Sequence, residues 1–128
     1  MASTKPENTF IKSVHRHLVD TYAEKMCNPY RAGIPDVWYS GFKRDLWVEY
    51  KFLPRTPRGL ILPNLSGQQK LWIERRKAEG RNVWVIVGMK EGGVVIKYYD
   101  QMEDGVKKYK VMSRKEIASM ISLFCNSN

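Results

Sequence analysis

The spacing of the hydrophobic residues predicts three helices. Across residues 7–25, apolar side chains recur at intervals of three and four, as they do on one face of a helix. Ser66 with Gln69, and Ser113 with Glu116, have the spacing of a capping box, so each serine is expected to begin a helix. The helices predicted in this way cover residues 7–25, 66–79 and 113–124.

Short runs of β-branched and aromatic residues, bounded by turn residues, predict the strands. These runs cover residues 36–39, 46–52, 82–87 and 94–99, with a weaker run at 109–112 and short candidate strands within 26–33 and at 60–62. Residues 41–44 are expected to join the first two runs as a hairpin, and the proline-rich segment 53–64 to form a loop. The order helix, strands, helix, strands, helix predicts a mixed α/β fold around a central sheet.

Composition and charge narrow the range of functions that the chain could have. The 128 residues suffice for one domain, and a hydrophobic content of 43% excludes general disorder. A net charge of +9 and a pI near 9.7 favour a polyanionic partner, either nucleic acid or an anionic membrane. The longest clean apolar run, residues 83–87, is too short to span a bilayer, and two cysteines make neither a disulfide framework nor a tetrahedral metal site. We therefore expect a cytoplasmic domain that is not secreted.

The candidate chemistry lies on the strand expected at 46–52. Alternation there puts Glu49 and Lys51 on the face opposite the apolar set. Asp36 begins the preceding strand, so a hairpin brings it beside Glu49. Two carboxylates with water and substrate oxygens suit Mg²⁺ or Mn²⁺, and a neighbouring lysine can stabilise charge on a phosphate. These are the components of metal-assisted phosphodiester hydrolysis.

Two further polar residues lie on stripes that should be apolar. Glu7 falls within the inward stripe of the first helix, and Gln69 falls on the side of its helix that faces the sheet. Charged residues are rarely buried without a partner. Because Glu7 and Gln69 are both expected to face inward, they support a shared polar site.

In sequence, Pro35-Asp36 followed by Glu49-Tyr50-Lys51 resembles the signature of the PD-(D/E)XK nucleases. The full set resembles, more specifically, the VRR-NUC branch (virus-type replication-repair nucleases) in its stand-alone, phage-type form. That set is Glu7, Gly33-Ile34-Pro35-Asp36, Glu49-Tyr50-Lys51 and Leu65-Ser66-x-x-Gln69, in this order. The resemblance spans about residues 7–88.

This resemblance implies a fold and a set of roles. The fold is a restriction-endonuclease-like α/β core, a helix, three strands, a helix and a strand (αβββαβ), with the first strand near residues 28–31. Residues 1–128 would form one nuclease domain, with residues 89–128 adding C-terminal strands and a helix. Asp36, Glu49 and the backbone carbonyl of Tyr50 would bind the metal, and Lys51 would contact the phosphate or the attacking water. Glu7 and Gln69 would complete the catalytic set by positioning water, a second ion or Lys51.

Basic residues concentrate around this predicted site. Between residues 43 and 81 there are ten lysines and arginines against four acids, which is +6 of the total +9. Arg55 and Arg58 are expected to hold flanking phosphates. The remaining candidates for DNA contact are Arg31, Lys43, Arg44 and Lys70.

Each assignment has a structural alternative. Asp36 could be a turn acid, and Glu49 with Lys51 an exposed pair on an edge strand. A capping box alone explains Gln69, and favourable interaction with the helix dipole explains Glu7. His15 and His17 point about 200° apart on a helix, cannot grip one ion together, and are expected at the surface or rim.

The sequence therefore predicts a Mg²⁺- or Mn²⁺-dependent DNA endonuclease without an organic cofactor or a membrane partner. No base-reading motif is visible, so we expect selectivity for branched DNA such as a Holliday junction. Such an enzyme would act as a homodimer, because two symmetric nicks need two sites. If it is phage-encoded, it would act in the host cytoplasm. The alternatives are a non-catalytic nucleic-acid-binding module and a nuclease that acts on flaps or RNA.

Overall fold

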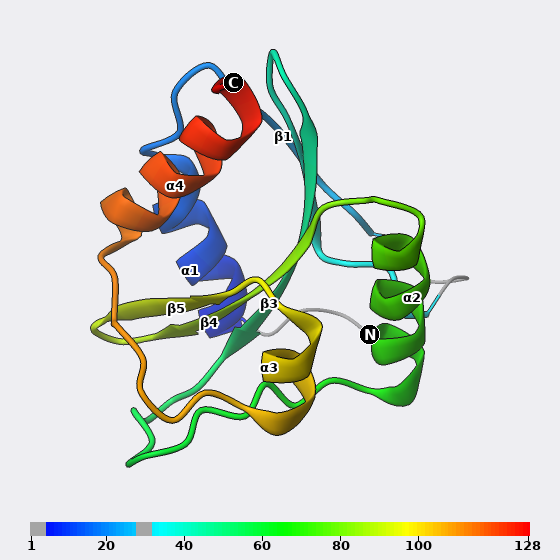
Figure 1. Ribbon diagram of the computed structural model, residues 1–128. Coiled ribbons are helices and arrows are strands. Elements are labelled where there is room, and N and C mark those ends of the chain that lie inside the picture. Colours follow the sequence, from blue (N-terminus) through cyan, green and yellow to red (C-terminus); the bar gives the residue numbers. More distant parts are fainter. Residues whose placement is uncertain (1–4, 28–31) are drawn as a thin grey trace.

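A five-stranded mixed sheet forms the centre of the molecule, and helices cover both of its faces (Figure 1). The computed structural model describes residues 5–27 and 32–128. In chain order the elements are α1 (Lys5–His15), β1 (Tyr22–Lys25), β2 (Val37–Ser40), β3 (Asp45–Phe52), α2 (Gly67–Ala78), β4 (Val83–Met89), β5 (Gly92–Ile96), α3 (Tyr99–Asp104) and α4 (Arg114–Asn126).

The strands lie side by side in the order in which they follow one another in the chain, β1 to β5. β1, β2 and β3 form an antiparallel meander, and β4 and β5 form a second antiparallel pair. β3 and β4 run parallel, so α2 is the crossover that joins them. This arrangement confirms the predicted α/β fold with a central mixed sheet.

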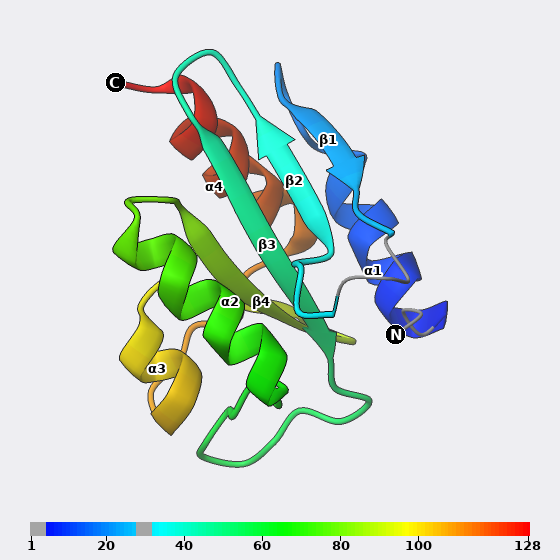
Figure 2. The ribbon, with the colours of Figure 1, turned by 90° about the vertical axis from the view of Figure 1, so that its right-hand side faces the viewer.

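The sheet separates two hydrophobic cores. α1 and α4 pack on one face, where Phe10 and Ile117 meet the inward side chains of β3. α2 and α3 contribute Ile73 and Met102 to the core on the other face (Figure 2). β3 contributes to both layers: Tyr50 is buried in the first core, while Trp47 packs against the second. The alternation predicted for β3 is thus confirmed, and Glu49 and Lys51 belong to the α2 side.

The first helix is shorter than predicted. α1 ends at His15, where the amide of Leu18 donates to the carbonyl of His15 (3.3 Å) in a tightened last turn. Asp20 then adopts a left-handed conformation (φ 49°), and the amide of Val19 donates to Ser122 Oγ of α4 at 3.0 Å. The chain leaves the helix through these contacts, and residues 22–25 become edge strand β1 instead of a last helical turn. The strand expected near residues 28–31 falls outside the described residues.

The C-terminal third also differs from the prediction. β5 ends at Ile96, and the short helix α3 follows where the strand was expected to continue. The strands expected at 109–112 and 60–62 are reduced to isolated bridges, Gly93 with Met112 and Ile61 with Val106. The two capping boxes are confirmed, and α2 and α4 begin directly after Ser66 and Ser113.

Candidate active site

Strand register places Asp36 beside Glu49. Val37 pairs with Val48 in the antiparallel β2–β3 ladder, so Asp36, one residue before β2, lies opposite Glu49. The two carboxyl groups lie close enough for each to shift the pKa of the other, and Asp36 Oδ2 accepts a bond from the backbone amide of Tyr50 at 2.8 Å. Asp36 is therefore fixed by the neighbouring strand and is no mere turn acid.

The segment before Asp36 is held against α2. Gly33 has a φ of +91°, a conformation that disfavours other residues, and a Cβ at this position would lie 2.6 Å from the carbonyl oxygen of Gln68. Glycine thus allows the Gly-Ile-Pro-Asp segment to approach the first turn of α2. This contact brings the turn of α2 that carries Gln69 toward the strand that carries Glu49.

Gln69 links the helix terminus to the carboxylate pair. Its Nε2 donates to Glu49 Oε2 at 3.0 Å, and its Oε1 accepts from Lys51 Nζ at 3.1 Å. The same Oε1 accepts from the backbone amide of Ser66 at 2.9 Å, which completes the capping box. The capping-box interpretation of Gln69 is confirmed, and the same capping box holds its amide group in contact with Glu49 and Lys51.

Glu49 is buried in the middle of the sheet with its charge only partly compensated. Its residue exposure is 4%, and Lys51 Nζ lies 3.7 Å from its Oε2. β3 has strands on both sides, so the alternative of an exposed pair on an edge strand is wrong. Glu7, in the first turn of α1, lies close enough for its charge to act on Glu49.

Burial raises the pKa values of both Asp36 and Glu49, and like charge raises that of Glu49 further. Burial, followed by the charge of Asp36, raises the pKa of Glu49 from 4.5 to about 9, although Lys51 opposes the shift. Burial also raises the pKa of Asp36, while the Tyr50 amide pulls it down. A further cation beside the two carboxyl groups would lower both pKa values and so favour the state in which both are ionised.

The donor set fits a hard divalent cation. In a strand, the N–H and C=O of one residue point toward the same neighbouring strand. Because the Tyr50 amide donates to Asp36, the Tyr50 carbonyl is directed to the same side of β3 as Asp36. Asp36, Glu49 and this carbonyl offer oxygen ligands, which Mg²⁺ and Mn²⁺ prefer. Within residues 5–27 and 32–128, no group of three or more His, Cys, Asp or Glu side chains is arranged to hold a metal. The candidate site thus relies on two carboxylates and a carbonyl.

The predicted DNA-binding residues fall into separate groups. Arg55 and Arg58 are exposed in the loop that follows β3, at the strand end nearest Lys51, and Lys70 is half-buried beside Gln69 on α2. Lys43 and Arg44 lie in the β2–β3 hairpin, at the end of β3 away from Glu49. Arg31 is outside the described residues.

Arg44 is engaged within the fold. Its Nη1 donates to the carbonyl of Phe124, and its guanidinium lies 5.1 Å from the centre of the Phe124 ring. The structure therefore gathers Asp36, Glu49, Lys51 and Gln69 into one cluster with Glu7 nearby, and it does not bring Arg44 to that cluster.

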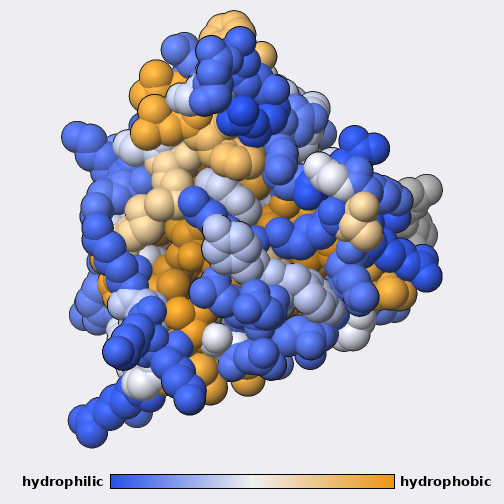
Figure 3. Space-filling model, viewed as in Figure 1, coloured by the Kyte–Doolittle hydropathy of each residue, from blue (hydrophilic) through white to orange (hydrophobic). Residues whose placement is uncertain are grey.

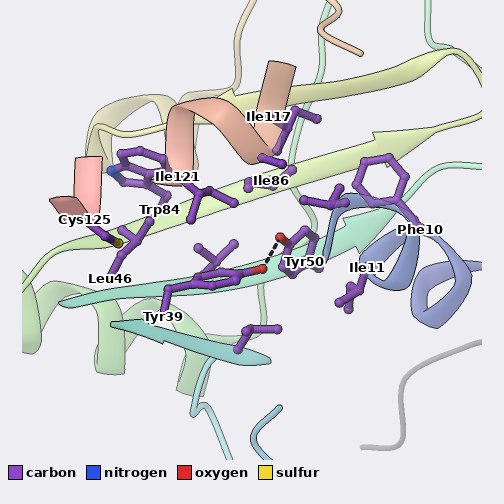
Figure 4. Close-up of a cluster of buried hydrophobic side chains, with 14 residues drawn as sticks. Phe10, Ile11, Tyr39, Leu46, Tyr50, Trp84, Ile86, Ile117, Ile121 and Cys125 are labelled. Carbon is purple, nitrogen blue, oxygen red and sulfur yellow. Dashed lines mark hydrogen bonds between the residues drawn. The ribbon is translucent and has the colours of Figure 1, made fainter. Parts of the chain in front are cut away.

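Sequence patterns missed a buried polar chain behind the site. His15 Nε2 is bonded to the hydroxyl of Tyr39 at 2.8 Å. The Tyr39 hydroxyl is bonded in turn to that of Tyr50 at 2.6 Å, as Figure 4 shows. Burial lowers the pKa of His15 to about 4, so the ring is neutral at pH 7. His15 is half-buried, whereas His17 is exposed at the surface as expected. The contact of His15 with Tyr39 crosses from α1 to β2 and has no signal in local sequence.

The chain shares its fold with a solved structure. The sequence matches no protein-family model and no curated protein. A Holliday junction resolvase from the archaeal hyperthermophile Archaeoglobus fulgidus is similar in structure, with a TM-score of 0.56 and 14% sequence identity over 92% of this chain and 99% of the resolvase. The fold is restriction-endonuclease-like. Among the described helices, none is long and apolar enough to cross a membrane.

Proposed function

We propose that this protein is a divalent-metal-dependent DNA endonuclease that cleaves branched DNA, with Holliday junctions as the preferred substrate. The observation that carries the proposal is the hydrogen-bonded cluster of Asp36, Glu49, Lys51 and Gln69 at the junction of β2, β3 and α2. Its position in a fold shared with a Holliday junction resolvase supports the choice of substrate. The order of its motifs further supports a place in the VRR-NUC branch, as a single phage-type nuclease domain.

The proposed roles follow from the contacts. Asp36, Glu49 and the Tyr50 carbonyl would hold Mg²⁺ or Mn²⁺, which when bound supplies Lewis-acid activation of the scissile phosphate and of water. Lys51 places a positive charge beside this position and would stabilise the negative charge that develops on the phosphate. Gln69 holds Lys51 and Glu49 in a fixed relation through its two amide atoms.

Glu7 contributes negative charge from the opposite layer of the fold. Its charge acts on Glu49 from the first turn of α1. We propose that it orders water or a second ion at the edge of the site.

A homodimer follows from the proposed substrate. Resolution of a four-way junction requires two symmetric cuts, and a two-fold dimer would present two copies of the cluster related by the symmetry of the junction. Arg55 and Arg58, exposed beyond the end of β3, would contact flanking phosphates on each arm.

A substrate panel tests the proposal. End-labelled four-way junction, flap, single-stranded and duplex DNA, with a matched RNA, are incubated with the protein in Mg²⁺, in Mn²⁺ or with a chelator. We expect two symmetric, metal-dependent cuts in the junction and little cleavage of plain duplex. Binding without cleavage in either metal would instead support a non-catalytic module, and preferred cleavage of flaps or RNA would contradict the junction assignment.

A further inference from the structure

A groove runs over α4 on the face of the molecule opposite α2. It has a volume of about 700 Å³, and a smaller hollow of about 210 Å³ beside it shares Lys97, Met112 and Met120 with it. α2 supplies Gln69 to the candidate active site on the other face of the sheet. The groove is therefore separate from the proposed site of cleavage.

The floor of the groove is apolar and partly uncovered. Met112, Met120, Leu123 and Phe124 line it, and Leu123 is 64% exposed on α4. Figure 3 shows hydrophobic atoms gathered over α4, among hydrophilic neighbours. The side of α4 that faces the sheet packs through Ile117 and Ile121. Leu123 belongs to a second apolar side of α4 that does not contact the sheet.

The rim of the groove is strongly basic. Arg44, Lys97 and Lys115 surround the larger hollow, and Lys108 and Lys110 extend the row along the smaller one. One acid, Glu116, lines the larger hollow, but its carboxylate is engaged by the amide of Ser113 and lies 4.0 Å from Lys110 Nζ. The local charge is therefore positive along the whole length.

We propose that this groove binds an acidic amphipathic segment of another protein. Apolar side chains on one face of such a segment would fill the space over Met120 and Leu123, and its carboxylates would meet the lysines of the rim. A second copy of this chain docked through the same groove is a poor occupant, because a two-fold contact would bring the basic rims of both copies together.

Nucleic acid also fits this surface poorly. Single strands bind where bases can stack on open aromatic faces. Here Lys97 Nζ lies 4.8 Å from the centre of the Trp84 ring and the Arg44 guanidinium lies over Phe124, so a cation of this chain already lies against each ring. The surface that remains is aliphatic and thioether-rich, which favours peptide side chains.

Fluorescence polarisation with a labelled synthetic peptide tests the proposal. The probe has about 15 residues, with leucines at helical spacing on one face and glutamates on both flanks. A scrambled peptide of equal composition is its control. We expect the probe to bind and the scrambled peptide to bind far more weakly. Leu123→Ser and the pair Lys97→Glu with Lys115→Glu should each weaken binding about tenfold, through lost apolar contact and lost charge complementarity respectively.

Matched variants separate the groove from general surface effects. Leu71→Ser removes a similarly exposed leucine from α2, and Lys12→Glu with Lys90→Glu makes the same change in net charge away from the groove. These variants should bind the probe as the wild type does. Equal binding of probe and scrambled peptide, or unchanged affinity in both groove variants, would overturn the proposal.

The other occupants give distinct results. A fluorescent oligothymidylate whose affinity falls in Leu123→Ser would make the groove a nucleic-acid site. Self-association in analytical ultracentrifugation that Leu123→Ser abolishes would make it a contact between copies. Either result overturns the proposal, and neither depends on cleavage, so the endonuclease assignment is tested separately.

Discussion

Glu49 is the residue at which this sequence departs furthest from what a central strand favours. Its exposure is 4%, and its nearest partners are another acid, a lysine and an amide. A buried carboxyl group that is not fully paired costs free energy of folding, so its position in β3 is explained better by function than by stability.

The raised pKa of Glu49 has a consequence for stability in the absence of metal. The folded protein keeps a proton on Glu49 up to a pKa of about 9, whereas the unfolded chain releases it near 4.5. Unfolding then releases a proton, so stability falls as pH rises between these two values. The lowered pKa of His15 acts in the opposite direction only between about 4 and 6.5, so the effect of Glu49 is clearest above pH 7.

Thermal denaturation in a chelator at pH 7 and pH 9 measures this effect. The Tm of the wild type should fall over this interval more than that of Glu49→Gln, which keeps the shape of the side chain without its charge. Parallel pH profiles for the two proteins would show that Glu49 does not carry the proton.

Lys51 should act on the chemical step more than on binding. Its ammonium lies 3.7 Å from Glu49 and is held by Gln69, as a group that stabilises the transition state should be. Lys51→Ala is expected to lower the single-turnover rate at saturating protein by about a hundredfold or more. Lys51→Arg should not restore it, because a guanidinium fork does not replace a compact ammonium group. A wild-type rate for Lys51→Ala at saturation would reduce Lys51 to a phosphate anchor.

The elements that position the site differ in how far local sequence predicts them. α2 and its capping box could be predicted because Ser66 and Gln69 carry the signal within four residues. The alternation that turns Glu49 and Lys51 to one face of β3 could be predicted for the same reason. The hairpin places Asp36 beside them, so the proximity of these residues to one another could be predicted from sequence, while their catalytic roles stay predictions.

The elements that the sequence did not predict depend on contacts between residues far apart in the chain. The segment 16–22 has the spacing of a helix, but Val19 and Thr21 bond to Ser122 of α4 and Tyr22 pairs with Ser40. The bridge of Met112 to Gly93 likewise depends on the edge strand β5. Such pairings join residues about 20 to 100 positions apart, so no local window records them.

At the N-terminus of α2, capping and activity can be separated. Ser66→Ala removes the side-chain cap and should cost about 1 kcal/mol of stability, while the backbone amide of residue 66 still holds Gln69. Gln69→Ala should cost a similar amount and also lower the cleavage rate, on the order of a hundredfold, because Lys51 and Glu49 lose their common partner. Chemical denaturation and single-turnover cleavage measure the two effects. Equal rates for the two variants would limit Gln69 to capping.

Across the whole molecule, basic residues lie both in the loop after β3, where the DNA contacts are proposed, and around the α4 groove. Arg55 and Arg58 belong to the loop, whereas Lys97 and Lys115 surround the larger hollow. The loop adjoins the smaller hollow through the bond from the Tyr109 hydroxyl to the carbonyl of Pro57. A basic protein of this kind can bind DNA through the loop and an acidic partner through the groove.

The contribution of the loop arginines appears in the salt dependence of DNA binding. Arg55→Ala with Arg58→Ala should weaken binding to all sequences alike and reduce the slope of log K against log salt by about 0.9 for each lost phosphate contact. Lys12→Ala with Lys90→Ala removes the same charge from other exposed positions and should leave the slope unchanged. Equal slopes for the loop variant and the wild type would place the DNA elsewhere.

Single-turnover cleavage of a four-way junction by the wild type, Asp36→Asn and Glu49→Gln tests the central claim most directly. Each substitution removes one anionic oxygen ligand with little change in shape. We expect the wild type to cut in Mg²⁺ or Mn²⁺ and not in a chelator. Both variants should fold, bind the junction in Ca²⁺ and fail to cut it. Cleavage by either variant at the wild-type rate and with the same metal requirement would contradict the assignment of Asp36 and Glu49 as the metal site.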